Sequence, residues 1–447
     1  MRDRLIALDE AGTPIKVAII GAGRFGSMMV AQVRRAPGMS MDLVCDLDVA
    51  KALQAFELAG IPQSSVSEVH AAADANDAIR GRRPAVTVDP NVVIESEVDV
   101  VVEATGHPDA GARHAFQSIT AGKHVVMVTV EADVVAGPHL AGMAKAAGVV
   151  YSLAYGDQPA IIEELFDWAV SMGFEVVAAG KGTKYLPEYR HSTPDEALEH
   201  YGTAAAEEFA SAINPRMYNS FLDGTKSAVE MCAVANMTGL RPDVPGMHFP
   251  GAGISELANV LRPREAGGIL ERSGVVEVVS SLRRDGSEIE DKLRWGVYVV
   301  ITTDSPYLRS CMKDYGVAVD DSGAYGIMYR PYHLVGMEAP VSIARAVLHG
   351  EPTGAPGARV CEVAAAAKRR LGVGELLDGE GGYTTYGLLL NANEADEQGL
   401  VPIGLSHGAT ILRPVEQDAL LTAADVKLQT GGFAGHLRKI QVEETAE

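Results

Sequence analysis

The sequence has few cysteines, no long apolar run and a shortage of positive charge. Its 447 residues contain four cysteines, which are scattered singly without a C-x-x-C pair. This argues against a disulfide framework and against a zinc knuckle. No run of about 18 apolar residues occurs, and residues 1–14 hold no apolar stretch of the kind found in signal peptides. These absences predict a cytoplasmic protein that does not enter a membrane.

The shortage of positive charge bears on partners. The chain has 38 basic and 59 acidic residues, and its formal net charge is −21. Such a surface repels nucleic acids and anionic membranes, so neither is an expected partner. A small anionic substrate would need a local basic pocket to overcome this field. The length is sufficient for about three domains of ordinary size.

A glycine-rich turn near the N-terminus is the strongest motif present. Segment 21–26 reads G-A-G-R-F-G, follows the apolar run 17–20 and precedes a helix-like segment. Three glycines at this spacing allow a tight turn, close approach of a pyrophosphate and packing of the helix on the strand. A second apolar run, 41–45, ends at an acid in the position typical of ribose binding. The predicted dinucleotide-binding residues are Gly21, Gly23, Arg24, Phe25, Gly26 and Asp46.

The choice between the two nicotinamide cofactors stays open in these residues. Asp46 favours NADH, because a carboxylate repels a 2′-phosphate. Arg24 can hold either the pyrophosphate or a 2′-phosphate.

Alternating strands and helices over 15–155 predict a doubly wound parallel sheet. The buried strand 99–105 should bring Thr105, Gly106 and His107 to the nicotinamide, although His107 equally suits a solvated loop.

Two segments further along the chain carry candidate substrate groups. Strand 174–179 leads into G-K-G-T-K-Y at 180–185, interpreted as a glycine-rich loop in which Lys181 and Lys184 bind a phosphate or carboxylate, or as a solvated surface loop. A helix over 223–237 has Asp223 as its expected N-cap, with Lys226 and Glu230 on one face. The rest of that helix is apolar, which favours a cleft over a solvated ion pair.

The remaining segments are less informative. Strands 275–281 and 295–302 predict a hairpin in an open α+β sheet suited to pairing subunits. Arg330 and His333 bracket a turn and suit either an anionic substrate or structural capping. A helix over 339–349 precedes the linker 351–357. Beyond it we expect a helix at 363–371 and short strands, with no catalytic constellation.

The predicted architecture is therefore α/β with three domains. Residues 1–156 form the Rossmann domain with a doubly wound parallel sheet. Residues 157–350 form an α+β catalytic and dimerisation domain, whose last helix, 339–349, can pack back on the Rossmann domain. Residues 351–447 form a small β-rich domain. The expected assembly is a homodimer.

Taken together, these motifs resemble the homoserine-dehydrogenase-like oxidoreductases that carry a C-terminal SAF (β-clip) domain, and among them the DRL type. The resemblance covers nearly the whole chain. It rests on segments 21–26, 130–133 (V-E-A-D), 155–159 (Y-G-D-Q-P), 180–185, 223–226 with Glu230, 330–333 (R-P-Y-H) and 377–382 (L-D-G-E-G-G). The chain departs from ordinary homoserine dehydrogenases, which have T-A-N-K where it has M-V-T-V at 127–130. It also lacks the Ser-Gly-Gly loop of the ordinary reductoisomerase.

The resemblance implies an NADPH-dependent conversion of 1-deoxy-D-xylulose 5-phosphate to 2-C-methyl-D-erythritol 4-phosphate, with NADH as the alternative cofactor. It implies that Lys181, Lys184 and Arg330 hold the phosphate and that Lys226 polarises the carbonyl. Asp223 and Glu230 would shuttle a proton or bind Mg²⁺ or Mn²⁺, a requirement left open. The other predicted substrate-binding residues are Tyr185, Asn236, His333, Asp157 and Gln158. Two alternatives remain: a dehydrogenase of another small hydroxy or sugar-acid substrate, and a cofactor-binding sensor without turnover.

Overall fold

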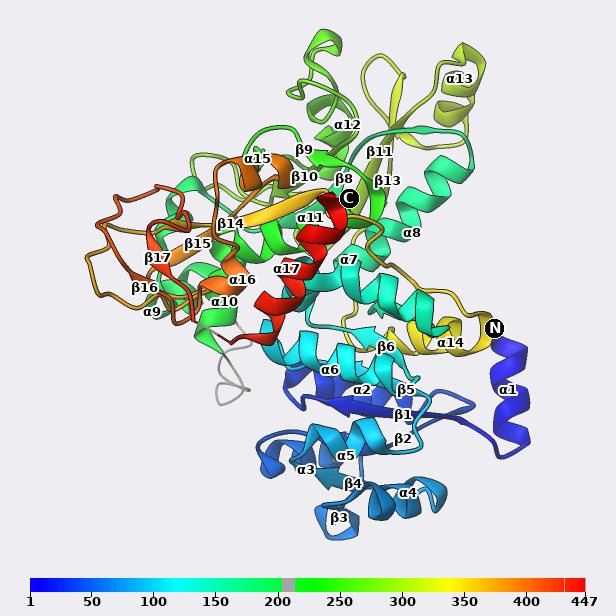
Figure 1. The fold of residues 1–447 in the computed structure, drawn as a ribbon. Helices are drawn as coiled ribbons and strands as arrows, with labels where there is room; N and C mark the ends of the chain where they lie inside the picture. The colour runs from blue at the N-terminus through cyan, green and yellow to red at the C-terminus, as the bar shows by residue number, and fades with distance from the viewer. Residues whose placement is uncertain (203–213, 430, 447) are drawn as a thin grey trace. The chain divides into compact units, whose positions relative to one another are not determined.

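The computed structural model describes residues 1–202, 214–429 and 431–446. Contacts divide the chain into two compact units, and each is built from separate stretches of sequence (Figure 1). Unit 1 comprises Met1–Ala160, Leu334–Gly357 and Gly431–Glu447. Unit 2 comprises Ile161–His333 and Ala358–Thr430. The three-domain division at 156/157 and 350/351 stays a prediction.

Unit 1 is built on a parallel sheet of seven strands in the order β3-β4-β2-β1-β5-β6-β7. Each neighbouring pair is parallel. The strands are β1 (Ile15–Ile20), β2 (Met39–Cys45), β3 (Ser67–Glu68), β4 (Ala85–Thr87), β5 (Val100–Glu103), β6 (His124–Met127) and β7 (Tyr151–Leu153). The predicted doubly wound sheet is confirmed.

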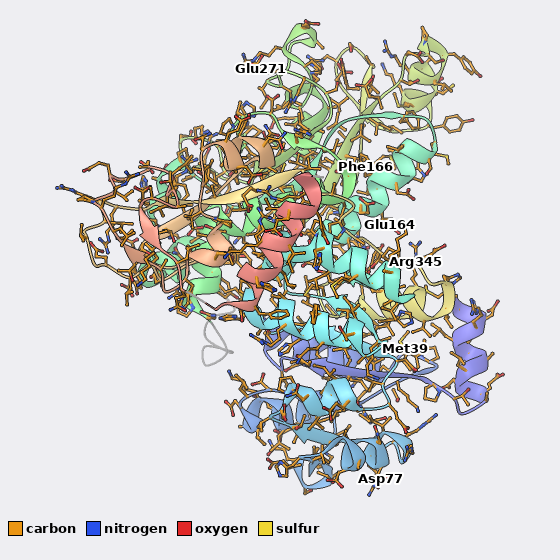
Figure 2. All side chains as sticks on the ribbon, viewed as in Figure 1. Met39, Asp77, Glu164, Phe166, Glu271 and Arg345 are labelled. Carbon is orange, nitrogen blue, oxygen red and sulfur yellow. The ribbon has the colours of Figure 1, made fainter. Side chains whose placement is uncertain are left out.

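Helices cover both faces of this sheet because its strands are apolar on both sides. Along β1, Val17 and Ile19 join one buried cluster, whereas Ala18 and Ile20 join another. The helices of unit 1 are α1 (Arg2–Glu10), α2 (Arg24–Val33), α3 (Val49–Leu58), α4 (Ala72–Arg80), α5 (Pro90–Glu95), α6 (Pro108–Thr120), α7 (Val130–Ala147), α14 (Ala339–His349) and α17 (Phe433–Ala446). Figure 2 shows the side chains, with Met39 labelled at the start of β2.

Two late segments of the chain belong to unit 1. Helix α14 contacts α2, β6 and β7, in the manner expected for 339–349. The C-terminal helix α17 lies along α6 and α7 (Figure 1), although sequence analysis placed it in the C-terminal domain. The Phe433 ring lies 5.2 Å from the Phe116 ring, and the Arg113 guanidinium lies 4.7 Å from the centre of Phe433. Aromatic and cation–π contacts therefore hold the chain end on unit 1.

Unit 2 contains a mixed sheet of six strands in the order β12-β13-β11-β8-β10-β9. These strands are β8 (Glu175–Thr183), β9 (Arg241–Pro242), β10 (Val275–Ser280), β11 (Val297–Thr302), β12 (Ala318–Val319) and β13 (Tyr325–Arg330). The expected hairpin of β10 with β11 is wrong, because β8 lies between them. It pairs parallel with β10 and antiparallel with β11.

The C-terminal part of unit 2 contains two separate antiparallel pairs of strands. One is formed by β14 (Cys361–Ala367) and β15 (Thr385–Asn391), and the other, shorter one by β16 (Thr410–Ile411) and β17 (Val426–Lys427). The helices are α8 (Gln158–Ser171), which begins in the first stretch of unit 1, α9 (Pro194–Tyr201), α10 (Pro215–Leu222), α11 (Thr225–Thr238), α12 (Leu257–Val260), α13 (Pro306–Asp314), α15 (Ala392–Glu397) and α16 (Ile403–Ser406). In the described parts of the chain, every helix is too short or too polar to cross a bilayer.

The helix predicted at 363–371 is wrong, because its first half is strand β14. Alanines dominate this stretch and favour a helix locally. All seven residues of β14 are buried, since β15 pairs along the strand and α11 packs against it. Small side chains fit a strand that is covered in this way, and tertiary packing overrides the local propensity.

Candidate active site

The predicted cofactor turn has the geometry that its glycines require. Gly21 has φ +104°, and a Cβ there would lie 2.5 Å from the Ala104 carbonyl oxygen. A Cβ on Gly26 would lie 2.1 Å from the Gly21 carbonyl oxygen, so this glycine lets α2 approach the turn. Gly23 differs, because nothing lies within 4 Å of its Cβ position. The second glycine therefore borders open space, which suits an approaching pyrophosphate.

The same turn ends at the N-terminus of α2. Gly23 is the N-cap, no side chain caps the helix there, and its first turn contains no acid. Backbone N–H groups at such an end favour an anion. Arg24 is exposed and Phe25 is half-buried beside it. Asp46 anchors the turn to the end of β2, since its carboxylate accepts hydrogen bonds from Ala22 N at 2.8 Å and Asp48 N at 2.9 Å.

Gly23→Val is expected to raise the dissociation constant for NADPH or NADH at least about tenfold, equivalent to about 1.4 kcal/mol. The new side chain meets no protein atom but fills the space left for the pyrophosphate. Titration calorimetry measures the affinity. Gly142→Val, on the exposed side of α7 and likewise free of neighbours within 4 Å, is the control. Equal affinity in Gly23→Val and wild type would contradict the assignment of this turn.

The second predicted cofactor segment is an exposed turn between β5 and α6. Gly106 has φ +70°, which favours glycine. His107 is the N-cap of α6, and its Nδ1 accepts a hydrogen bond from Ala110 N at 3.4 Å. Thr105 donates a hydrogen bond of 2.6 Å to Glu103. The histidine thus has a structural role, and its contact with the nicotinamide stays a prediction.

A buried acid follows the next strand. Strand β6 stops at Met127, and α7 begins at Val130. Asp133, in the first turn of α7, is fully buried and accepts a hydrogen bond of 2.9 Å from the Tyr151 hydroxyl. Burial raises the pKa of Asp133 to about 7. The folded protein therefore holds this carboxyl in its neutral form in weak acid.

Asp133 predicts a pH dependence of stability. Its folded-state pKa lies above the ordinary value, so its contribution is fully present below that ordinary value and is lost as pH rises through about 7. Asp133→Asn removes the titration, and the variant should gain up to about 4 kcal/mol of unfolding free energy relative to wild type between pH 4 and pH 8. Urea denaturation at several pH values measures the difference. A pH-independent difference would contradict the prediction.

In unit 2, the predicted phosphate-binding loop at 180–185 is wrong in its first part. Strand β8 continues to Thr183, and Gly180 and Gly182 lie between two neighbouring strands. A Cβ on Gly180 would lie 1.7 Å from the Glu277 carbonyl oxygen, and one on Gly182 would lie 2.1 Å from that of Leu293. These glycines serve close packing of backbone rather than binding of an anion.

The two lysines of this segment have different surroundings. Lys181 is buried and forms an ion pair with Glu230 of α11, which is buried too. Lys184 is half-buried and donates to the His200 carbonyl. Burial, together with the nearby Arg294 charge, lowers the pKa of Lys184. The positive charge of Lys181 is therefore neutralised inside the protein, which weakens its predicted role as a phosphate ligand.

Asp223 also has a lysine partner, which sequence analysis missed. It is not the N-cap of α11, because Gly224 holds that position. One oxygen of Asp223 accepts a hydrogen bond from Thr225 N at 2.8 Å, and the other lies 2.7 Å from Lys368 Nζ. Lys368 donates as well to the carbonyls of Ser192 and Gly382, at 2.7 and 2.8 Å. The C-terminal part of unit 2 thus supplies a charge to a predicted catalytic acid.

A small pocket lies beside Asp223, and sequence analysis missed part of its lining. Polar and aromatic side chains line it, namely Tyr185, Arg190, Asp223, Phe249 and Tyr386. The Tyr185 and Phe249 rings are 4.2 Å apart. Arg190 hydrogen-bonds the Tyr185 hydroxyl and lies 5.3 Å from the centre of the Tyr386 ring. Lys368 and Tyr386 both come from 351–447, and the expectation that this segment carries no catalytic constellation stays a prediction.

The other predicted substrate residues are not part of the lining of this pocket. Asn236 accepts hydrogen bonds from Val360 N at 2.7 Å and Cys361 N at 3.0 Å, so its amide joins α11 to β14. The Arg330 guanidinium lies 4.5 Å from the centre of the Tyr332 ring, and His333 Nδ1 lies 2.6 Å from the Trp295 carbonyl oxygen. Asp157 and Gln158 belong to unit 1, and Lys226 is half-buried in the first turn of α11.

The predicted acids do not form a site for Mg²⁺ or Mn²⁺. Glu230 is paired with Lys181, and Asp223 with Lys368, whereas these cations need several oxygen ligands. Within 1–202, 214–429 and 431–446, no three His, Cys, Asp or Glu side chains come together in a way that could hold a metal ion. We therefore assign these residues no step through a metal.

Two family models match consecutive segments of the chain. Residues 21–153 match the family described as "Homoserine dehydrogenase, NAD binding domain". Residues 156–339 match the family described as "Oxidoreductase DRL, catalytic domain". No curated protein sequence matches the chain.

Solved structures show only remote likeness. A scyllo-inositol dehydrogenase from Lactobacillus casei is 13% identical, with a TM-score of 0.40 and coverage of 77% of this chain and 92% of its own. A probable dehydrogenase from Thermotoga maritima is 13% identical, with a TM-score of 0.38 and coverage of 76% and 91%. The 1-deoxy-D-xylulose 5-phosphate reductoisomerase of Zymomonas mobilis is 17% identical, with a TM-score of 0.30 and coverage of 41% and 51%. Likeness of this degree assigns no function.

Proposed function

We propose that this chain, an NAD(P)-dependent oxidoreductase with a DRL-type catalytic domain, converts 1-deoxy-D-xylulose 5-phosphate to 2-C-methyl-D-erythritol 4-phosphate. The match of residues 156–339 to the DRL catalytic domain carries this proposal. NADPH is the proposed cofactor, with NADH as the alternative that Asp46 favours. The net reaction consumes one NADPH and one proton for each molecule of product.

The proposed chemistry is an isomerisation that rearranges the carbon skeleton, followed by hydride transfer to a carbonyl group, and the bound cofactor would supply the hydride. Negative charge develops on the carbonyl oxygen as the hydride arrives. We assign the stabilisation of this charge to the Lys226 ammonium, because a cation aimed at a developing alkoxide lowers the barrier. Lys184 and Arg330 are the proposed phosphate ligands, since Lys181 is already paired with Glu230.

A second candidate is the oxidation of a small hydroxy or sugar-acid compound without a phosphate by NAD(P)⁺, or the reverse reduction of its carbonyl form. The buried pair of Lys181 with Glu230 favours it, because this pair removes one of the three cations expected to hold the phosphate. A single carboxylate needs fewer cationic partners than a phosphate dianion. The two candidates therefore differ in how strongly activity depends on Lys184 and Arg330.

Steady-state assays distinguish the candidates. The full chain is mixed with 1-deoxy-D-xylulose 5-phosphate and NADPH or NADH, or with homoserine or a panel of aldonates and NADP⁺ or NAD⁺, because these hydroxy acids can only give up a hydride. Cofactor turnover is followed by absorbance. The proposal requires 2-C-methyl-D-erythritol 4-phosphate as the product, identified by mass spectrometry. Turnover of unphosphorylated compounds alone would support the second candidate. Cofactor binding without turnover of any compound would favour a sensor.

A further inference from the structure

Glu103 is the last residue of β5 and is fully buried. It pairs in register with Ile20, the last residue of β1, immediately before the glycine turn. It thus lies at the carboxyl ends of the parallel strands, the edge where such sheets bind dinucleotides. Burying a carboxylate is costly unless hydrogen-bond donors surround it. The partners of Glu103 therefore indicate why the chain keeps an acid there.

Three of these partners lie on the Oε1 side of the carboxylate. Oε1 accepts hydrogen bonds from Thr105 Oγ1 at 2.6 Å and Thr105 N at 3.4 Å. His114 Nδ1, on α6, lies 3.2 Å from the same oxygen. Glu103 therefore ties the start of the 105–107 turn to the helix that follows it.

The other oxygen extends this network to the neighbouring strand. Oε2 accepts a hydrogen bond from the hydroxyl of Thr129, which follows β6 and is buried. Thr129 Oγ1 in turn accepts a hydrogen bond of 2.9 Å from Gly106 N. The N–H groups of residues 105 and 106 thus both lead to Glu103, one directly and one through Thr129.

Neighbouring atoms pack closely around the Glu103 carboxylate. A Cβ on Gly111 would lie 3.1 Å from Glu103 Oε2 and 2.9 Å from the Ala132 side chain. Helix α6 therefore packs directly over the carboxylate, whereas residues 105–107 themselves are exposed. An exposed turn is fixed from below by one buried acid.

We propose that Glu103 is a positioning residue, which holds the 105–107 turn in the shape that receives the nicotinamide end of the cofactor. The glycine turn of 21–26 binds the pyrophosphate independently of this network. Loss of Glu103 should therefore weaken the nicotinamide half of the contact and leave the adenosine half intact.

Glu103→Gln tests this on the full chain. Its amide nitrogen cannot accept the bond that one threonine hydroxyl donates, and a hydrogen bond to a charged group contributes about 1.5–3 kcal/mol. The expected result is a dissociation constant for NADPH or NADH raised about 10-fold to 100-fold. The affinity for ADP-ribose, or its 2′-phosphate, should stay unchanged, because these ligands lack the nicotinamide. Titration calorimetry measures both.

Two further variants make the test decisive. Thr129→Val keeps the acid and removes the hydroxyl that links it to Gly106, together with the bond that this hydroxyl donates to Glu103. It should show the same selective loss even where Glu103→Gln fails to fold. Asp133→Asn alters another buried acid of unit 1 that bonds Tyr151 rather than the turn, and it should leave both affinities unchanged. Equal weakening of the cofactor and the fragment, or no weakening of either, would overturn the proposal. So would a wild-type chain that binds neither cofactor.

Discussion

Replacing Lys181 with methionine is expected to lower the free energy of unfolding by about 3–5 kcal/mol, as the loss of one partner from a buried ion pair does elsewhere. Lys181 lies on the central strand β8, flanked by Val278 and Val297 on the adjacent strands. It is 4% exposed, and its partner Glu230 is 3% exposed. The methionine fills similar space but leaves the glutamate charge uncompensated. Urea denaturation monitored by circular dichroism measures the loss.

Two comparisons show whether the pair is responsible. The double variant Lys181→Met/Glu230→Leu removes both charges and should recover most of the lost stability. Lys292→Met breaks an exposed pair with Glu288 in the same unit, and such pairs contribute at most about 1 kcal/mol. A Lys181→Met variant that is no less stable than Lys292→Met would contradict the buried pair.

Lys226→Ala is expected to lower kcat on the order of a hundredfold or more, with a much smaller change in KM. The reason is that the ammonium is proposed to act on charge that develops only in the transition state. Lys226 is half-buried in the first turn of α11, and its neighbours Thr225 and Ser227 are buried. The measurement is steady-state kinetics with the substrate that the activity panel identifies.

The control for Lys226→Ala is Lys313→Ala, which changes an exposed lysine in the last turn of α13. Circular dichroism first confirms that both variants are folded. Normal turnover by Lys226→Ala would remove the lysine from the mechanism. A raised KM with an unchanged kcat would instead give it a role in binding the substrate before reaction.

Local sequence patterns were sufficient to predict the doubly wound sheet of unit 1, because its strands and the helices between them follow one another along the chain. Helix α3, for example, begins directly after Asp48, whose carboxylate caps it by accepting a hydrogen bond from Ala50 N at 3.0 Å. Local patterns gave wrong predictions where pairing with strands distant in the sequence determines the secondary structure. The alanines of β14 and the glycines of β8 suit a helix and a loop by themselves. Their neighbours β15, β10 and β11 make them strands.

The candidate site also has one part that local sequence patterns predict and another part that they miss. The sequence motif alone predicts the cofactor turn, because each of its glycines meets a local steric requirement. Lys368 was missed because its partner Asp223 lies far away in the sequence, and no local pattern marks a lysine that becomes buried. Glu103 did leave a signal, because a lone acid at the end of the apolar run V-V-V predicts a buried carboxylate with dedicated donors.

The chain passes between its two units repeatedly, after residues 160, 333, 357 and 430. Neither unit is therefore a continuous segment that a gene truncation could excise. After a protease cut in 358–430, the contacts of α17 with α6 and α7 should hold the C-terminal fragment on unit 1, so nicked material should still migrate as one particle under native conditions. During synthesis, unit 1 cannot acquire its last helix until the whole of unit 2 has left the ribosome. Assembly of the cofactor-binding part is thus linked to synthesis of the α17 segment.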